Sequence, residues 1–380
     1  MRTDKTKPIL RRGRMIICIL LLLLVGGLGL FFRHTTTMLP GQQAAGRWGG
    51  DAGRFAQVTV FLPEYGGLTQ GTVNGLLSGI WGELVTEGLE PATPAGSPVF
   101  AYSAEGVLQV SSRDRGPVTV YATGVGGNFF LFHPVQLVSG SMLPVESINR
   151  DLVLIDETVA WWLFGATDVA GMELIIGGRT HLISGVYRQN GDFASRAASG
   201  DTPHMFLYYD AMEGMPPITA IEAVLPNPIS GIAEEMFENA LDGADMEEGD
   251  FVLVNNTDRY RVFSLLSVAR DFGQRSMYRT GLRLPYWENA ARMAEDFAAL
   301  TLVLMLLLLV YPVITAVTVL VRLWRRRKWR FFRGVYRRAD ARRERKREAI
   351  WQETHPQSGE DVSFDVDDII RQVRESEEEI

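Results

Sequence analysis

The side chains that most often carry acid–base or metal chemistry are scattered in this chain of 380 residues. The five histidines are His34, His133, His181, His204 and His355, and no two of them stand four positions apart. None joins an acid in the H-E-x-x-H pattern, which places two histidines on one helix face to bind zinc. The sequence therefore argues against a zinc site.

Other motifs of catalysis or ligand binding are incomplete. The glycine-rich segment 124–127, GVGG, lacks the Lys-Ser/Thr pair of a phosphate-binding loop, so we interpret it as a turn or a close approach of the backbone. The segment 139–141, SGS, is not a G-x-S-x-G nucleophile elbow. The segment 365–368, DVDD, lacks the central Gly and terminal Glu of a calcium loop. We predict no cofactor, no metal and no enzymatic activity.

Two apolar runs are long enough to cross a membrane as helices. They are residues 15–32, MIICILLLLLVGGLGLFF, and residues 300–321, LTLVLMLLLLVYPVITAVTVLV. A cleaved signal peptide is the alternative for the first run, but its apolar core exceeds the roughly 7–15 residues typical of one. Pro312 is expected to kink the second helix. Both runs are predicted to be transmembrane helices.

The flanking charges predict the orientation of the two spans. Residues 1–14 carry a net charge of +5 and residues 322–347 carry +12, whereas residues 33–299 carry −15. Because Lys and Arg concentrate on the cytoplasmic side, we expect a two-span cell-membrane protein with both termini cytoplasmic and residues 33–299 extracytoplasmic. The single cysteine, Cys18, lies in the first span, so core packing must hold the outer domain together.

Hydrophobic periodicity predicts alternating strands and helices in the outer domain. Residues 33–56 have no periodicity and are interpreted as a linker. Residues 57–62 and 218–225 have strand patterns, and residues 129–132 read as an extended segment. Thr69 is expected to cap one helix and Ser230 another.

The segment 151–188 is the most structured stretch by pattern. It predicts strand, helix, strand, Gly-Gly turn and strand. Asp156 is a plausible N-cap and Gly165 a plausible residue after the helix end. Gly177-Gly178 suits a two-residue type I′ turn. Of the adjacent Trp161 and Trp162, one is expected to enter the core, whereas the other lies at a seam or is partly exposed.

A helix over residues 287–299 is expected to run into the second span as a stalk. Tyr286 and Trp287 lie too far from the apolar run for an interfacial belt, so we expect them to pack on the outer domain. Such a stalk could pass motion between the outer domain and the membrane. A plain spacer is the alternative.

The segment 322–347 interleaves arginine with aromatic residues next to the membrane. We interpret it as contacting anionic lipid headgroups, and we prefer this to nucleic-acid binding because of its position. The residues assigned to this contact are Trp324, Arg325, Arg326, Arg327, Lys328 and Trp329.

The acidic tail, residues 348–380, ends in a short amphipathic pattern. A partner-docking helix is one hypothesis; folding back onto the arginine-rich stretch and a frayed, solvated tail are the alternatives. The residues assigned to docking are Phe364, Ile369, Ile370 and Val373.

Four motifs in order resemble the extracytoplasmic core domain of MacB-type ABC-transporter permeases. They are the strand 152–155, the helix end 160–165, the acidic turn 168–171 and the hairpin strand 180–187. The resemblance implies an α+β fold between the two transmembrane helices. In it, a porter-like α/β subdomain carries an inserted β-rich subdomain, here at about 140–215.

That family usually has four spans and an associated ATPase, whereas this chain has two spans and no nucleotide-binding motif. The resemblance therefore implies a non-enzymatic permease-like subunit that couples a separate ABC ATPase, with another permease chain, to export or release of a peptide or lipid-like substrate. The alternative function is an extracytoplasmic binding, scaffold or signalling module that does not transport.

Overall fold

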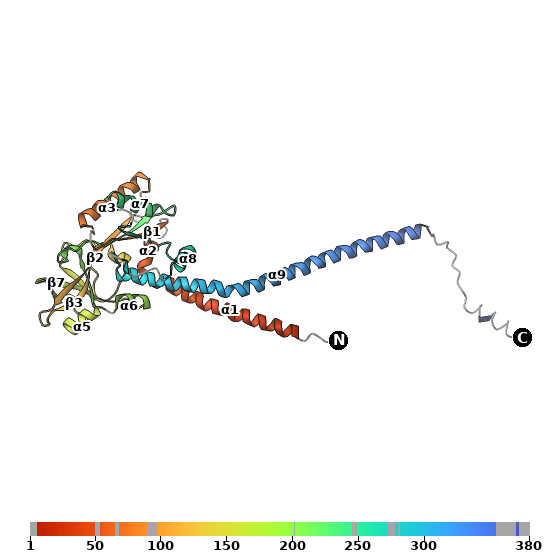
Figure 1. Ribbon diagram of the computed structural model, residues 1–380, viewed down its shortest axis with the longest axis horizontal. Helices are drawn as coiled ribbons and strands as arrows, with labels where there is room; N and C mark the ends of the chain where they lie inside the picture. The colour runs from red at the N-terminus through yellow and green to blue at the C-terminus, as the bar shows by residue number, and fades with distance from the viewer. Residues whose placement is uncertain are drawn as a thin grey trace. The chain divides into compact units, whose positions relative to one another are not determined.

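Figure 1 shows the computed structural model of the chain, which divides into two compact units, Met1–Val310 and Tyr311–Ile380. The structure describes residues 6–49, 54–64, 68–89, 97–200, 202–244, 246, 249–272, 278–279, 282–354 and 370–371. The large first unit contains the globular domain. The described part of the second unit consists of the remainder of one long helix and residues 370–371.

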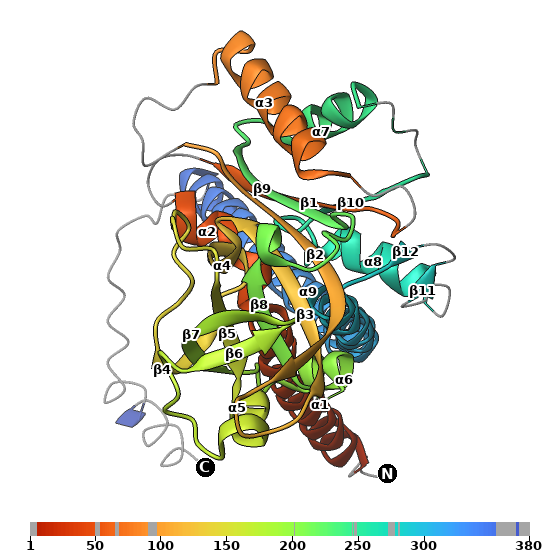
Figure 2. The same cartoon turned by 90° about the vertical axis from the view of Figure 1, so that its left-hand side faces the viewer.

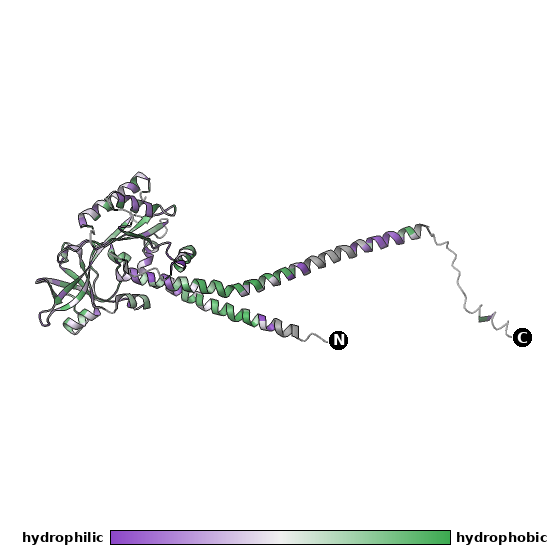
Figure 3. Ribbon diagram, viewed as in Figure 1, coloured by the Kyte–Doolittle hydropathy of each residue, from purple (hydrophilic) through white to green (hydrophobic). Residues whose placement is uncertain are grey.

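Two long helices carry the apolar runs. They are α1 (Thr6–Thr37) and α9 (Tyr286–Thr354). The segments Arg12–Thr37 and Tyr286–Arg325 are long and apolar enough to cross a membrane by length and composition. Figure 3 shows the hydrophobic colouring concentrated along α1 and along the part of α9 nearest the domain. The predicted helical form of both runs is confirmed, and α9 continues through Pro312.

One mixed ten-stranded sheet organises the domain. Its order is β10-β1-β9-β2-β3-β8-β5-β7-β4, with β6 pairing both β2 and β7. The pairs β3–β8 and β5–β7 are parallel and the others are antiparallel. The strands are β1 (Phe55–Phe61), β2 (Val99–Ser111), β3 (Val118–Gly127), β4 (Gln136–Gly140), β5 (Leu152–Asp156), β6 (Glu173–Ile176), β7 (Arg179–Arg188), β8 (His204–Tyr208), β9 (Ala220–Pro226) and β10 (Val252–Asn255).

Short helices and a small hairpin surround this sheet. The hairpin pairs β11 (Tyr278–Arg279) with β12 (Leu282–Arg283). The short helices are η1 (Pro40–Gln43), α2 (Ala44–Gly49), α3 (Gln70–Thr86), α4 (Phe129–Phe132), α5 (Glu157–Phe164), α6 (Phe193–Ser199), η4 (Tyr209–Ala211), α7 (Ile232–Asp242) and α8 (Val262–Arg270).

The sheet has two regions with separate cores. At one end, α3 and α7 cover β1 and β9, as Figure 2 shows, and bury a cluster that includes Ile80 and Phe237. At the other end, β2, β3, β8, β5, β7 and β6 pair in a closed ring around a second apolar core. The α+β fold class is confirmed. Strands β5 to β8 lie within the range assigned to the β-rich insertion, and its boundaries at 140–215 stay a prediction.

Local turn and cap chemistry is confirmed in several places. Thr69 accepts a hydrogen bond from the backbone N of Thr72 at the start of α3. Asp156 caps α5 by accepting from Val159 N at 2.7 Å, and Gly165 ends that helix at φ 73°. Gly177 and Gly178 have φ of 54° and 78°, which is the left-handed pair that a type I′ turn requires.

The prediction that residues 33–56 form a linker is wrong. Helix α1 extends to Thr37, and η1 and α2 follow it. The buried side chain of Gln57 accepts from Ala44 N at 2.8 Å and donates to Gly41 O at 2.6 Å. Ala44 and Ala45 are also buried in an apolar cluster with Phe61 of β1, so polar and apolar contacts together hold this stretch. Elements this short bury too few apolar residues to show a hydrophobic period.

Three further expectations are wrong. Residues 129–132 form the single helical turn α4, because Phe129 and Phe132, three positions apart, are both buried on one side. Ser230 does not cap α7, since Gly231 occupies the cap position at φ 106°. Neither Trp161 nor Trp162 enters the core; they are 55% and 46% exposed, because Val159, Ala160 and Leu163 fill the buried face of α5.

Candidate functional site at the junction of the domain and helix α9

Helix α9 begins inside the domain core. Trp287, its second residue, is buried and packs against Phe129 and His133, with ring centroids 5.8 Å and 4.6 Å away. Tyr286 lies against His204, with ring centroids 5.7 Å apart. The prediction that Tyr286 and Trp287 pack on the outer domain is therefore confirmed.

His133, which packs against Trp287, is itself held to the sheet. His133 Nε2 lies 2.5 Å from Glu222 Oε2, and both side chains are buried. Glu222 stands on β9, and its other oxygen accepts from Thr59 Oγ1 on β1 at 3.3 Å. A chain of contacts thus runs from strands β1 and β9 to the first turn of α9.

A buried cluster of charges makes a second connection between the domain and α9, starting at the residue after Trp287. Arg259, in the loop after β10, donates to both oxygens of Glu288 at 2.6 and 2.8 Å and to Glu295 Oε1 at 2.6 Å. Arg292 donates to Glu288 Oε1 at 2.8 Å. All four side chains are less than a tenth exposed. Two arginines and two glutamates balance the charge of this group, which we name the Arg259 cluster.

The Arg259 cluster joins three parts of the chain. Arg259 Nη1 also donates to Gln42 Oε1 in η1 and to Asn256 Oδ1, both at 2.9 Å. Burial alone lowers the pKa of Arg259, but Glu288 and Glu295 together raise it well above its ordinary value. The guanidinium therefore stays charged, and removing either partner would leave an unpaired buried charge.

Small residues line the face of α9 that meets the domain. Ala290, Ala291 and Ala294 pack with Leu39 and Ala194, and Ala298 and Ala299 pack with Leu265. Because alanine lets neighbouring backbones approach closely, this face fits tightly against the end of α1, α6 and α8. Aromatic, ionic and small-residue contacts together hold about three turns of α9.

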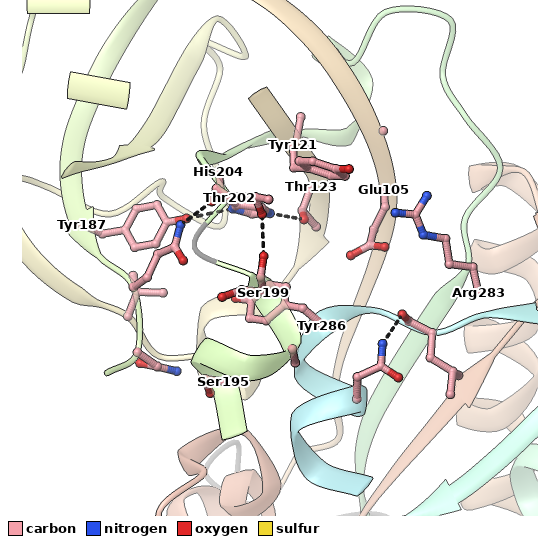
Figure 4. A pocket seen from close by; sticks show the side chains of 18 residues that line it. Glu105, Tyr121, Thr123, Tyr187, Ser195, Ser199, Thr202, His204, Arg283 and Tyr286 are labelled. Carbon is pink, nitrogen blue, oxygen red and sulfur yellow. Dashed lines mark hydrogen bonds between the residues drawn. The ribbon is translucent and has the colours of Figure 1, made fainter. Parts of the chain in front are cut away.

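A cavity of about 180 Å³ lies beside the first turn of α9. Figure 4 shows polar side chains around it from β2, β3, α6 and α9, with Arg283 of β12 near Glu105. The lining includes Glu105, Thr123, Tyr187, Ser195, Ser199, Thr202, His204, Arg283, Tyr286 and Asn289.

Two titratable residues of the cavity have shifted pKa values. Burial raises the pKa of Glu105 to about 7, although Arg283 partly opposes the shift. Burial lowers the pKa of His204 to about 3, so its ring is neutral. The two ring nitrogens of His204 lie 2.9 Å from Thr123 Oγ1 and 2.8 Å from Tyr187 Oη. Because both ring nitrogens already have hydroxyl hydrogen-bond partners, we interpret His204 as a structural residue.

No group of three or more His, Cys, Asp or Glu side chains suited to a metal ion occurs in the described part of the chain.

The glycine-rich segment 124–127 is a close backbone approach, as expected. A Cβ at Gly126 would fall 2.1 Å from the ring of Tyr102, and one at Gly127 would fall 2.4 Å from Phe100 O.

The residues predicted to contact lipid and partners lie in the second unit. Trp324 and Arg325 are exposed on α9. Arg326, Arg327, Lys328 and Trp329 belong to the same helix, and their side chains lie outside the described residues. Of the tail residues, Ile370 is described and exposed, whereas Phe364, Ile369 and Val373 lie outside the described residues.

Sequence reasoning missed the Arg259 cluster. A signal was present, because Glu288, Arg292 and Glu295 follow the i, i+4, i+7 spacing of one helix face. The same face of α9 also carries the buried alanines. Charges that face water ordinarily lie on the other side of a helix. Arg259 gave no local signal, since it meets Glu288 only through the fold.

No protein-family model matches the chain, and no curated protein sequence matches it. Among solved structures, the chain is similar to the periplasmic region of MacB from Actinobacillus actinomycetemcomitans, with 15% identity and a TM-score of 0.38 over 53% of this chain and 89% of that one. It is also similar to the extracellular domain of the noncanonic ABC-type transporter YknZ from Gram-positive bacteria, with 14% identity and a TM-score of 0.38 over 52% of this chain and 100% of that one.

Proposed function

We propose that this chain is a non-enzymatic, membrane-anchored subunit like the MacB-type ABC-transporter permeases. It would couple a separate ATPase to an extracytoplasmic domain that exports or releases a peptide or lipid-like substrate. The observation that carries the proposal is the buried joint of Trp287 and the Arg259 cluster, which fixes the domain to an apolar helix.

The joint suits the transfer of force better than a flexible tether would. Rotating or sliding α9 would pull Glu288 and Glu295 away from Arg259 in a site closed to water. Breaking a buried ion pair in this way costs several kcal/mol, about 3–5. A displacement of α9 is therefore passed to β1, β9 and β10 instead of being absorbed at the junction.

The charge pattern supports the proposed orientation. The basic flanks 1–14 and 322–347 favour cytoplasmic ends, with residues 33–299 outside. In that orientation Trp324, Arg325, Arg326, Arg327, Lys328 and Trp329 lie at the inner leaflet. The tail residues Phe364, Ile369, Ile370 and Val373 are then available to dock on a cytoplasmic partner.

The proposed partners follow from the resemblance to MacB-type permeases. We assign ATP hydrolysis to a separate ABC ATPase, and another permease chain to the same assembly. Membrane lipids are the remaining partner, and nucleic acid is not among them.

The second candidate is an extracytoplasmic binding, scaffold or signalling module. The polar cavity beside Tyr286 favours it, because a molecule bound there would contact the first turn of α9. In this case the tail would meet a signalling or cell-wall protein and no ATPase.

Cross-linking in native membranes, followed by purification of the tagged chain and mass spectrometry, separates the two. Three forms are compared: the full chain, one without 348–380 and one without 329–380. The last keeps Arg322 and residues 325–328 next to the membrane, so its orientation signal remains. An ATPase recovered with the full chain and lost without 329–380 supports the transporter subunit. Cell-wall or signalling proteins, with no ATPase above background, contradict it.

A further inference from the structure

Helix α8 turns an apolar face away from the domain. Phe263 is 87% exposed, Val262 is 51% exposed, and Leu266 lies on the same side. On the side of α8 that faces the domain, Leu265 is fully buried. A solvent-facing helix of a globular domain ordinarily carries polar side chains there, so this face is unusual for contact with water.

The packing of α8 fixes its height along the two long helices. Leu265 lies in one cluster with Leu302 and Met305 of α9 and Phe32 of α1. Phe32 is the last residue of the first apolar run, and Leu302 is the third residue of the second. At 1.5 Å per residue, α8 lies within about 3 Å of the point where the apolar surface of α9 begins. Figure 1 shows α8 beside α9 on the side of the domain from which α1 and α9 leave.

Apolar side chains of α9 are exposed at the same height along the helix as α8. Leu300 is 57% exposed and Phe297 is 37% exposed, at the height where Ala298 and Ala299 touch Leu265. Phe272, just after α8, is 58% exposed. The exposed guanidinium of Arg270 at the end of α8 suits a position among lipid phosphates.

We propose that α8 is an interfacial helix, which lies in the outer leaflet and inserts Val262, Phe263 and Leu266 below the headgroups. This inference rests on the membrane placement in the proposed function. The occupant is lipid, because α8 packs on α1 and α9 at the height at which both apolar runs meet the domain. An amphipathic helix of this kind binds by burying aromatic and aliphatic side chains 5–10 Å into the headgroup and acyl boundary. It would hold the domain at a set height and tilt over the bilayer.

Spin labels on the full chain in nanodiscs test the proposal. Because Cys18 is the single cysteine, Cys18→Ser gives a cysteine-free background. Labels are placed singly by Phe263→Cys and Val262→Cys on α8 and by Leu307→Cys in the span. Ile148→Cys is the matched control, since this apolar residue is fully exposed in the loop between β4 and β5. The nanodiscs contain phosphatidylcholine and phosphatidylglycerol, and collisions with oxygen and with a water-soluble nickel chelate are measured.

The expected result is a label at 263 that resembles the label at 307. Collisions with oxygen should exceed those with nickel severalfold, whereas the label at 148 shows the reverse. A label at 263 that matches 148 shows that α8 faces water and overturns the inference. A label shielded from both reagents shows that protein covers α8 and also overturns it. If the label at 307 is open to nickel, the membrane placement in the proposed function fails as well, which separates the two failures.

Discussion

Arg259 is the residue whose replacement should weaken the joint with α9 most. Arg259→Met leaves Glu288 and Glu295 as buried carboxylates without their main partner. We expect the free energy of unfolding to fall by about 3–5 kcal/mol. Arg113→Met removes the surface ion pair between Glu173 and Arg113, whose side chain is 74% exposed. This control should change the free energy of unfolding by less than about 0.5 kcal/mol. Denaturant unfolding of the full chain in detergent micelles measures both.

A partner substitution distinguishes lost pairing from lost packing. After Arg259→Met, Glu288 keeps its ion pair with Arg292, so the cluster has one carboxylate in excess. The double variant Arg259→Met with Glu295→Gln should therefore recover part of the loss, because it removes that excess charge. Equal stability of the Arg259→Met and Arg113→Met variants would contradict the assignment of the cluster as a joint.

Glu105 should make stability depend on pH in a direction opposite to that of a paired carboxylate. Its pKa is about 7 in the fold against 4.5 in the unfolded chain, mainly because of burial. The folded state therefore binds the proton more tightly, and stability is lost as pH rises from about 4.5 to 7. Glu105→Gln cannot ionise, so its stability should equal that of the wild type near pH 4 and exceed it by about 3 kcal/mol at pH 8.

Thermal unfolding of both proteins from pH 4 to pH 8 measures this difference. Other titrating groups cancel in the comparison, since the two proteins differ at one position. A difference that stays constant across this range would show that Glu105 ionises as it does in the unfolded chain.

Local rules predicted single residues well where their partners are near in sequence. Asp156, Gly165 and the Gly177-Gly178 turn satisfy backbone requirements within four positions. The prediction that Ser230 caps a helix was wrong, because its hydroxyl donates to Asp258, 28 positions away. The Arg259 cluster was missed for the same reason, since Arg259 and Glu288 are 29 positions apart.

At the scale of elements, the start of α5 ties three strands together. Asp156 Oδ1 caps the helix, and Oδ2 accepts from His204 N at 3.0 Å and from the side chain of Gln189. The side chain of Asp192, which caps α6, accepts only the bond from Ser195 N among the hydrogen bonds of the described residues. Asp156→Ala should therefore cost about 2–3 kcal/mol, whereas Asp192→Ala should cost about 1 kcal/mol.

The same denaturant experiment compares these two caps. Equal losses would show that the bonds from His204 and Gln189 contribute little, and that Asp156 acts as an ordinary N-cap.

Long periodic elements were predictable, and short ones were not. The spacing of Val73, Leu76, Ile80 and Leu84 gives α3 in the positions that the structure buries. In contrast, η1, α2 and α4 are stabilised by contacts with other parts of the chain. Gln57 and Arg259 hold η1, and Trp287 covers Phe129. No pattern within such a short stretch carries that information.

At the scale of the whole molecule, the sequence gives the class of fold but not its strand order. The ring of six strands closes through β6, whose Ile176 pairs with Val110 of β2, far away in the chain. The strand patterns at 57–62 and 218–225 were recognisable, but the direct pairing of these segments as β1 and β9, far apart in the chain, was not. Long-range strand pairing of this kind leaves no local periodicity.

In the proposed function, α9 is rigidly fixed to the domain and carries motion between it and the membrane. Hydrogen exchange of the full chain in nanodiscs measures this rigidity, because amides exchange slowly only where local opening is costly. We expect residues 286–299 to exchange as slowly as β1 and β9, and at least tenfold faster in Arg259→Met. Exchange of 286–299 as fast as that of the exposed loop 145–150, while β1 stays protected, would show that the start of α9 is a flexible spacer and not a rigid joint.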